Sequence, residues 1–141
     1  MLTVNFVRTE ETAATPVKAS GGACAYDLVA TSIKEDGYYV SYGTGIVLAI
    51  PEGYVGLVFP RSSISDTGWT LCNSVGVIDC DFRGELKLRF YKVSGTANRP
   101  YNLGQRIGQL VVVELPKLHF QEVSTLNNTS RGNGSFGSTG K

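Results

Sequence analysis

The sequence predicts an all-β domain, folded as a sandwich or a distorted barrel. Its β-branched residues are 15 Val, 12 Thr and 6 Ile against only 8 Ala, a mixture typical of strands. Short apolar runs recur between turn residues, which is the spacing of short strands packed in two layers. No stretch has the periodicity of a long amphipathic helix. At 141 residues, the chain suits one domain.

Seven apolar runs mark the expected strands. In chain order they are 2–7, 38–42, 46–50, 54–59, 85–91, 107–115 and 118–123. The run 85–91 alternates cleanly, because Leu86, Leu88 and Phe90 share one face, so that face should lie in the core. The run 110–113 has no polar alternation. We therefore expect both of its faces to be buried, one of them against another subunit.

The composition excludes several classes of function. Lys and Arg number 13 against 12 Asp and Glu, so the chain lacks the basic excess of most nucleic-acid-binding proteins. Charged residues make up 18% and hydrophobic residues 42%, which does not fit intrinsic disorder. No apolar run approaches the ~20 residues of a membrane span. His119 is the one histidine, which excludes a zinc site built on several. We expect neither nucleic acid nor a membrane as a partner.

The cysteines and the first residues indicate the compartment. Cys24, Cys72 and Cys80 form an odd set without a C-x-x-C pair, which favours reduced thiols. Residues 1–16 lack the basic start and the apolar stretch of a secretory signal. We therefore expect a protein that is not secreted and is cytoplasmic, or nuclear or in the host-cell cytosol if its source is eukaryotic or viral.

The segment 60–66 predicts one or two helical turns after a proline, with Ser62 or Ser63 capping the start. Backbone N–H groups point outward at a helix start, and two hydroxyls and Arg61 would add donors, so the segment could cradle a phosphate. An ordinary cap beside a surface arginine is an equally good interpretation of this segment alone.

The segment 73–85 predicts a β-hairpin, in which a short apolar strand passes through a tight turn into the alternating strand. Such a hairpin would present backbone N–H and C=O groups to a flat base, and Asn73 offers both a donor and an acceptor. Asp79 follows Val77 and Ile78, so it would sit at a partly dry rim, where a carboxylate can act as a general base. A structural turn with solvated acids is the alternative.

Two polar side chains interrupt otherwise apolar segments. Asp27 lies in 25–28, at the entry to a strand, where it could accept from the backbone or orient metal-bound water. Gln109 lies in 104–110, at the start of a buried strand, where an amide needs partners. A turn aspartate and a satisfied strand-end glutamine are the alternatives.

The segment 127–141 is rich in Asn, Ser, Thr and Gly and cannot form a core. We therefore expect a β-barrel domain in 1–126 and a flexible arm in 127–141. The end of the arm has the composition of a P-loop but the wrong register. Its glycines still permit close backbone approach to phosphates, while Arg131 adds charge and Phe136 a stacking face. A disordered tail is the alternative.

Taken together, five segments resemble the five motifs of the trimeric dUTP diphosphatase (dUTPase) family. They are AYDL at 25–28, PRSS at 60–63, GVIDCDFRGE at 76–85, GQRIGQL at 104–110 and RGNGSFGSTGK at 131–141. The resemblance implies a distorted β-barrel or jelly-roll subunit in a homotrimer, in which the C-terminal arm is exchanged between subunits. It also implies Mg²⁺-dependent hydrolysis of dUTP to dUMP and pyrophosphate, which limits uracil incorporation into DNA and supplies dUMP.

The resemblance assigns roles to particular residues. Asp79 matches the catalytic aspartate, which deprotonates the water that attacks the α-phosphorus. Asp27 matches a position that reaches Mg²⁺ through water, the ion being held mainly by the triphosphate. The implied substrate-binding residues are Arg61, Ser62, Ser63, Asn73, Val77, Ile78, Phe82, Lys87, Gln109, Arg131, Phe136, Gly137, Ser138 and Thr139.

Two positions depart from the family pattern. Phe82 stands where the family often has Tyr, so a ring can still stack under the sugar, but a phenol hydrogen bond is lost and UTP is excluded less strictly. Ser63 stands where Gly is frequent, a small change that should leave phosphate binding intact. Two other functions stay open: a dCTP deaminase, which shares the fold, and a non-enzymatic regulator that binds a partner through this scaffold.

Overall fold

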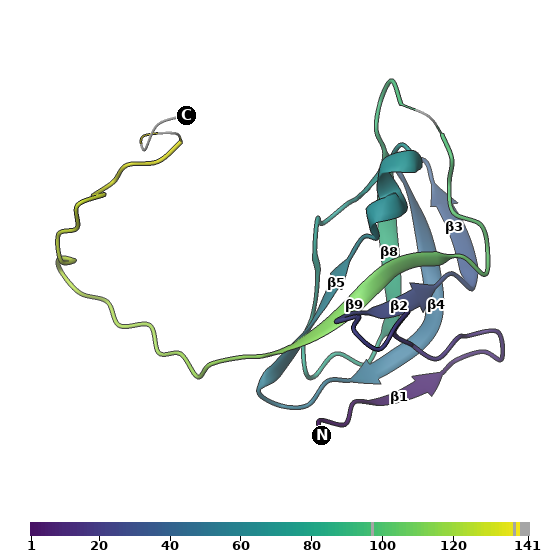
Figure 1. The fold of residues 1–141 in the computed structure, drawn as a ribbon, viewed down its shortest axis with the longest axis horizontal. Coiled ribbons are helices and arrows are strands. Elements are labelled where there is room, and N and C mark those ends of the chain that lie inside the picture. Colours follow the sequence, from purple (N-terminus) through teal and green to yellow (C-terminus); the bar gives the residue numbers. More distant parts are fainter. Residues whose placement is uncertain (97, 137, 139–141) are drawn as a thin grey trace.

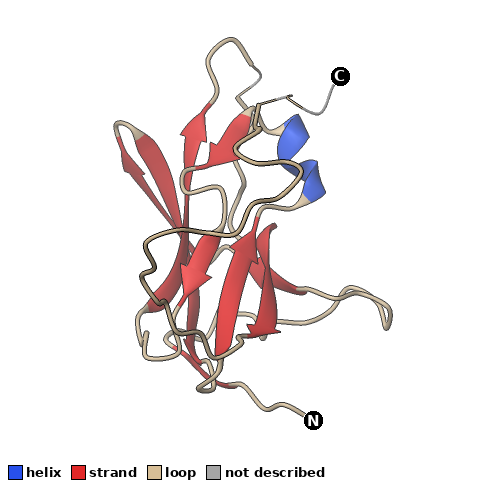
Figure 2. Ribbon diagram, turned by 90° about the vertical axis from the view of Figure 1, so that its left-hand side faces the viewer, coloured by secondary structure: helices blue, strands red, loops and turns tan. Residues whose placement is uncertain are grey.

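The computed structural model describes residues 1–96, 98–136 and 138 (Figure 1). Two antiparallel sheets face each other, and one short helix lies at their edge (Figure 2). The predicted all-β fold is confirmed, because the described residues form nine strands and only a single 3-10 helix. Nowhere in the described ranges is there a helix of the length and hydropathy that a membrane crossing needs.

The first sheet orders its strands β1–β4–β8–β6, with β3 also paired to β4. These strands are β1 (Asn5–Arg8), β3 (Ser32–Asp36), β4 (Tyr39–Ala49), β6 (Trp69–Leu71) and β8 (Glu85–Lys92). The second sheet orders its strands β2–β9–β5–β7. They are β2 (Tyr26–Val29), β5 (Tyr54–Phe59), β7 (Gly76–Ile78) and β9 (Arg106–Glu114). Neighbouring strands are mostly non-consecutive, so segments far apart in the sequence lie side by side.

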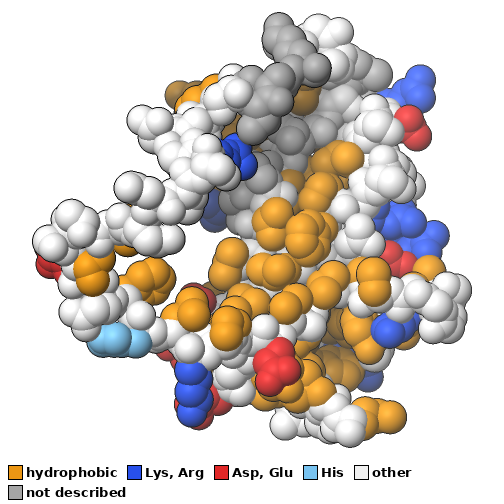
Figure 3. Space-filling model, turned by 60° about the vertical axis from the view of Figure 1, so that its left-hand side comes forward, with side chains coloured by type: hydrophobic (Ala, Val, Ile, Leu, Met, Phe, Trp, Pro, Cys, Tyr) orange, Lys and Arg blue, Asp and Glu red, His pale blue; other side chains and the backbone are white. Residues whose placement is uncertain are grey.

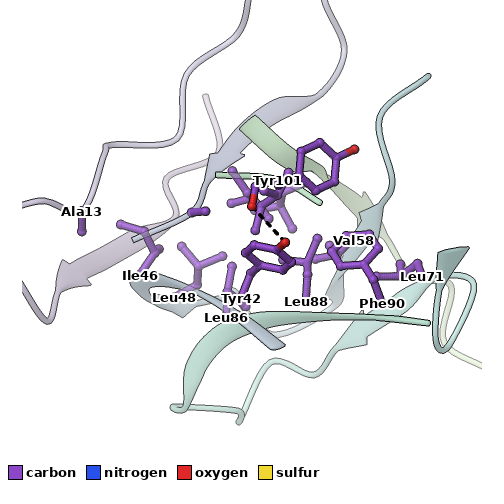
Figure 4. Close-up of a cluster of buried hydrophobic side chains, with 14 of the residues drawn as sticks. Ala13, Tyr42, Ile46, Leu48, Val58, Leu71, Leu86, Leu88, Phe90 and Tyr101 are labelled. Carbon is purple, nitrogen blue, oxygen red and sulfur yellow. Dashed lines mark hydrogen bonds between the residues drawn. The ribbon is translucent and has the colours of Figure 1, made fainter. Parts of the chain in front are cut away.

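The core fills the space between the sheets (Figure 4). Leu86, Leu88 and Phe90 are at most 2% exposed, which confirms the alternation predicted for this strand. The Phe90 ring packs against those of Tyr42 and Tyr101, with centroids 5.8 and 5.7 Å away. The Tyr42 hydroxyl donates to the Tyr101 carbonyl oxygen at 3.0 Å. These contacts fix the loop that precedes β9 against the core.

The predicted strands 38–42 and 46–50 are a single strand, β4, rather than two. Gly45 has a φ of +64°, and the register with β8 shifts around it, so a β-bulge bends the strand without ending it. The Glu85 carboxylate accepts from the Gly45 N–H at 2.9 Å, and the Thr44 hydroxyl donates to a β8 carbonyl oxygen at 2.8 Å. These partners are distant in the sequence, so the local pattern could not indicate them.

The predicted β-hairpin in 73–85 is wrong in its pairing. β7 pairs with β5, through Gly56 opposite Ile78, whereas β8 pairs with β4 and β6. The turn between β7 and β8 therefore crosses from one sheet to the other. The free edge of β5 competes for β7, and pairing there packs the Ile78 side chain against the core.

The predicted strand 118–123 does not form. The described chain after β9 contains no strand and runs away from the sandwich (Figure 1), and Leu118 and Phe120 are 73% and 91% exposed. A strand needs a neighbour for its N–H and C=O groups, and 118–123 pairs with none of the described strands. Figure 3 shows hydrophobic side chains gathered on the face beside the arm. Val113 is 41% exposed, so burial of 110–113 against a second subunit stays a prediction.

The helical turns predicted after Pro60 are confirmed as the 3-10 helix η1 (Ser62–Asp66). The predicted cap is wrong, because Arg61 occupies the N-cap with an extended backbone and no side-chain capping bond forms. In a 3-10 helix this short, the turn closes through the backbone instead, where the Ile64 N–H donates to the Arg61 carbonyl oxygen at 3.0 Å. The Ser62 and Ser63 hydroxyls are therefore not used as caps.

Candidate active site

A basic cleft of about 560 Å³ opens beside η1. Arg61 and Ser63 reach it from the start of η1, Arg99 from the loop before β9, and Arg106 from the first residue of β9. Asp66 is the one acid among the described residues that line it. Guanidinium groups bind carboxylate and phosphate oxygens well, so three of them around one cleft favour a polyanion.

Asp27 joins two of these arginines. It lies on β2 with a side chain only 12% exposed, and its Oδ2 is 3.1 Å from Arg106 Nη1 while its Oδ1 is 3.5 Å from Arg61 Nε. Because each carboxylate oxygen holds a different guanidinium, the two arginine side chains are fixed relative to each other. The contact of Asp27 with a metal through water stays a prediction.

Gln109 lies between Asp27 and the segment that leads into η1. The strand register pairs Gln109 with Asp27 on β2 and with Phe59 on β5. Its Nε2 donates to the Pro60 carbonyl oxygen at 3.1 Å, so it ties the start of the η1 loop to β9. Three segments that are far apart in the sequence therefore meet at one end of the second sheet. The binding of substrate by Gln109 stays a prediction.

A second pocket, of about 90 Å³, lies between β7 and β8. Asn73, Val77, Ile78 and Lys87 line it together with Val58, Leu71, Gly76, Leu86 and Leu88. A Cβ at Gly76 would stand 3.2 Å from the Val58 side chain, so the glycine lets β7 approach β5 closely. A small pocket with mostly apolar walls, one amide group and one lysine amine suits a flat ring with few polar edges.

Asp79 follows β7 directly and is exposed. Its carbonyl oxygen accepts from the Phe82 N–H at 3.2 Å, which closes the turn. The Phe82 ring lies over Gly84, where a Cβ would meet the ring atoms, so a side chain at this position would displace the ring. The Phe82 ring is itself 41% exposed. The turn thus presents an acid and an aromatic face on the same short loop.

Asp79 and Arg61 lie at opposite ends of β5. The pairing of Gly56 with Ile78 places Asp79 beside Val55, which is six residues before Arg61. A strand advances ~3.3 Å per residue, so the two side chains start roughly 20 Å apart. One phosphate group therefore cannot contact both side chains of the same chain.

The arm carries the remaining predicted residues. Arg131, Phe136 and Ser138 are exposed on the segment that projects from the sandwich (Figure 1). Arg131 Nε donates to the backbone oxygen three residues ahead at 3.0 Å, so this part of the arm forms a local turn. Gly137 and Thr139 lie outside the described residues.

The predicted site residues thus fall into three groups. These are Asp27, Arg61, Ser62, Ser63 and Gln109 around the start of η1; Asn73, Val77, Ile78, Asp79, Phe82 and Lys87 around β7; and Arg131, Phe136 and Ser138 on the arm. The sequence reasoning missed three residues of the basic cleft, Arg99, Tyr101 and Arg106. Arg106 stands within the GQRIGQL segment, which was an available signal, but nothing local distinguishes Arg99 or Tyr101.

The described residues offer no group of three or more His, Cys, Asp or Glu side chains that could hold a metal ion. Mg²⁺ usually keeps several waters and binds through one or two carboxylates together with substrate phosphates. The donors present here, Asp27, which pairs with two arginines of the basic cleft, and the exposed Asp79, fit an ion that is carried by a phosphate chain.

The fold and its two pockets define an all-β subunit that can bind a polyanion and a flat ring. The chain belongs to the dUTPase family, whose model matches residues 11–140. The deoxyuridine 5'-triphosphate nucleotidohydrolase of Corynebacterium glutamicum is 37% identical over 141 residues, which cover 98% of this chain and 95% of that protein. The protein of the same name from Rhodococcus erythropolis is 41% identical over 130 residues, covering 89% and 78%.

Solved structures share the fold. A dUTPase of Staphylococcus bacteriophage 80alpha, solved with dUpNHpp, superposes with a TM-score of 0.83 over the whole of both chains at 23% identity. A dUTPase of phage phi11 of S. aureus, described with a structural Mg(II) ion, gives a TM-score of 0.71 over 88% of this chain and 98% of that chain, also at 23% identity. At this identity the likeness establishes the fold alone.

Proposed function

We propose that this protein hydrolyses dUTP to dUMP and pyrophosphate, at sites shared between the subunits of a homotrimer. The observation that carries the proposal is the family match over residues 11–140, which includes every one of the three groups of site residues. The separation of Asp79 from Arg61 by roughly the length of β5 supports the shared site, because the family's chemistry needs both at one triphosphate.

The basic cleft binds the triphosphate. Asp27 pairs with both Arg61 and Arg106 and fixes their positions, so their guanidinium groups are pre-organised for phosphate oxygens and need little reordering when the substrate arrives. The Ser62 and Ser63 hydroxyls do not cap η1, so they can donate to phosphate oxygens at its start. Mg²⁺ bound to the triphosphate, with water between it and Asp27, would offset the charge that builds up on the leaving pyrophosphate.

The small pocket beside β7 binds uracil. The Asn73 side chain and the backbone at Val77 and Ile78 offer donors and acceptors to the edge of the ring, and the apolar walls cover its faces. A site built for the uracil pattern leaves polar groups unpaired when cytosine binds, so discrimination can be large. Lys87 lines the same pocket and adds a positive charge near the nucleotide, while the exposed Phe82 ring stacks under the sugar.

Asp79 is the general base. Its carboxylate takes a proton from a water molecule whose oxygen bonds to the α-phosphorus, while the bond from that phosphorus to the bridging oxygen breaks and pyrophosphate leaves with the electron pair. A carboxylate suits this chain, because its one imidazole, His119, lies on the exposed segment after β9. The exposed position of Asp79 leaves it open to water and to a partner subunit.

The arm of a third subunit closes the site. Arg131 would contact the far end of the phosphate chain, Phe136 would stack on uracil, and Gly137, Ser138 and Thr139 would add phosphate contacts. The arm is suited to this task because its described residues make no strand with their own sandwich. Closure would also exclude water from the triphosphate, which strengthens every charge interaction in the site.

A pyrophosphate-release assay across the deoxynucleoside and ribonucleoside triphosphates tests the proposal. dUTP should be hydrolysed in preference to dCTP and dTTP, and the rate on UTP measures how strictly ribose is excluded when Phe82 lacks a phenol hydroxyl. An ammonia assay with dCTP run in parallel separates hydrolysis from deamination. Ammonia release without pyrophosphate release would assign the fold to a deaminase, and the absence of both activities would leave only a binding role.

A further inference from the structure

One buried hydroxyl in the wall of the basic cleft has no hydrogen-bond partner. Among the buried side-chain nitrogen and oxygen atoms of the described residues, this is true only of Tyr101 Oη. Tyr101 is 8% exposed and lines the cleft together with Arg61 and Ser63. Leaving a buried hydroxyl unpaired costs free energy, so such a group in a native fold calls for an explanation.

Core packing fixes the Tyr101 ring, and the position of the ring sets the direction of the unpaired hydroxyl. The ring packs at 6.1 Å from Tyr42 and 5.7 Å from Phe90, and the Tyr101 carbonyl oxygen accepts from the Tyr42 hydroxyl. Figure 4 shows the Tyr101 hydroxyl pointing away from the other labelled core side chains. The ring therefore packs in the core, while the hydroxyl lies at the wall of the cleft.

The hydroxyl keeps its proton under ordinary conditions. Burial raises the pKa of the Tyr101 phenol, and the nearby Ser63 hydroxyl and the Arg61 charge lower it by less, so the net direction is upward. The Ser63 hydroxyl is close enough to influence this pKa, but it does not meet the geometry of a hydrogen bond with Tyr101 Oη. Tyr101 is therefore available as a donor near neutral pH and is not an acid or a base in the reaction. Its oxygen is shielded from solvent, so it is placed to act on a neighbouring side chain rather than directly on a bound ligand.

Ser63 is the side chain on which it can act. In this structure Arg61 Nη1 donates to Ser63 Oγ at 3.4 Å, a long contact. A triphosphate in the cleft would draw the Arg61 guanidinium toward its own oxygens, since a charged acceptor competes well with a hydroxyl. Ser63 would then need another donor in order to keep its own proton directed at the substrate.

We propose that Tyr101 is a positioning residue of the phosphate site: its hydroxyl donates to Ser63 Oγ in the substrate complex, so that the Ser63 proton points at a phosphate oxygen. This inference rests on the proposed function, because it takes the basic cleft as the triphosphate site. It explains why a tyrosine, rather than an apolar residue of similar size, occupies a core position that borders the cleft.

The variant Tyr101→Phe tests the proposal, because it removes the hydroxyl and keeps the ring. The KM for dUTP should rise roughly threefold to tenfold, the effect of one lost hydrogen bond, with little change in kcat. In a Ser63→Ala background the same change should alter KM by less than about twofold, because the two residues act as one unit. The melting temperature of Tyr101→Phe should equal or exceed that of the unmodified protein, since an unpaired buried hydroxyl is gone.

A matched control and a second readout complete the design. Tyr38→Phe removes a hydroxyl from a side chain that is 88% exposed, and it should change neither KM nor stability. Calorimetric binding of inorganic tripolyphosphate to the same variants measures the coupling without turnover, so loss of dUTP hydrolysis in the unmodified protein would count only against the proposed function. The inference is overturned if Tyr101→Phe leaves KM and tripolyphosphate affinity unchanged, if its effect is equally large without Ser63 Oγ, or if the variant melts at a lower temperature.

Discussion

Mixed trimers provide the sharpest test of a site shared between chains. Two variants are needed, Asp79→Asn, which removes the proposed base, and Arg61→Ala, which removes a proposed phosphate contact. Each should be inactive alone, because every site in a uniform trimer then carries the lesion. Both positions lie at the surface end of a strand or loop rather than in the core, so both variants should fold.

The strand register sets the size of the expected recovery. Asp79 lies beside Val55 and Arg61 follows Phe59, so β5 separates them by roughly 20 Å within one chain. If each site takes Asp79 from one subunit and Arg61 from the next, a trimer that contains both variants has one intact site in three, because its subunits divide two to one. If both residues came from the same chain, every site would keep one lesion and no activity would return.

The assay uses two affinity tags, so that only trimers containing both variants are purified after joint refolding. Pyrophosphate release from dUTP is then compared with the unmodified protein treated in the same way. Recovery near one third supports the shared site. Verified mixed trimers with no activity above the separate variants would refute the reasoning from the register, and a sedimentation mass of one chain would refute the assembly itself.

Four further results are expected. The variant Asp79→Asn should lose about a hundredfold or more in kcat while still binding dUpNHpp, because the charge is lost and the shape is kept. Deletion of 131–141 should leave a folded trimer with little activity, as measured by sedimentation and pyrophosphate release, since the described part of this segment packs on no strand. The variant Gly108→Ala should lower the free energy of unfolding, measured with urea, by about 1–3 kcal/mol, because its Cβ would collide with the Leu88 side chain and crowd a carbonyl oxygen. Burial raises the pKa of the Tyr42 phenol above 10.0. The stability that the neutral phenol contributes is therefore complete below pH 10.0 and is lost as the pH rises beyond it. In Tyr42→Phe the free energy of unfolding should fall less steeply with pH in this range.

Each of these results has a control. Asp81→Asn changes a neighbouring exposed acid and should keep kcat near normal, so equal losses at both positions would deny Asp79 a special role. A truncated chain that hydrolyses dUTP at the full rate would contradict the proposed role of the arm in closing the site. Gly21→Ala adds a methyl group where nothing lies within 4 Å, and it should cost much less than the change at Gly108. If stability falls with alkaline pH equally in the unmodified protein and in Tyr42→Phe, groups other than the Tyr42 hydroxyl control this loss of stability.

The sequence by itself determined the elements whose signal is local. The alternation through Leu86, Leu88 and Phe90 predicted a strand and its buried face, because side chains on a strand point to opposite sides in turn. The proline and serines before Ile64 predicted a short helix. Family motifs placed candidate residues at positions such as Asp79, since motif order survives without any knowledge of contacts.

Only the tertiary structure decided which segments meet. β7 pairs with β5 rather than β8, and β4 is one bulged strand. Both features depend on pairing partners that the periodicity of the sequence does not identify. The link from Asp27 to Arg61 and Arg106 also joins three separate segments. The unpaired Tyr101 hydroxyl became visible only when its surroundings were known. The physical reason is the same throughout: periodicity reports which face of an element is buried, whereas contacts depend on how the sheets pack, and packing is a property of the whole chain.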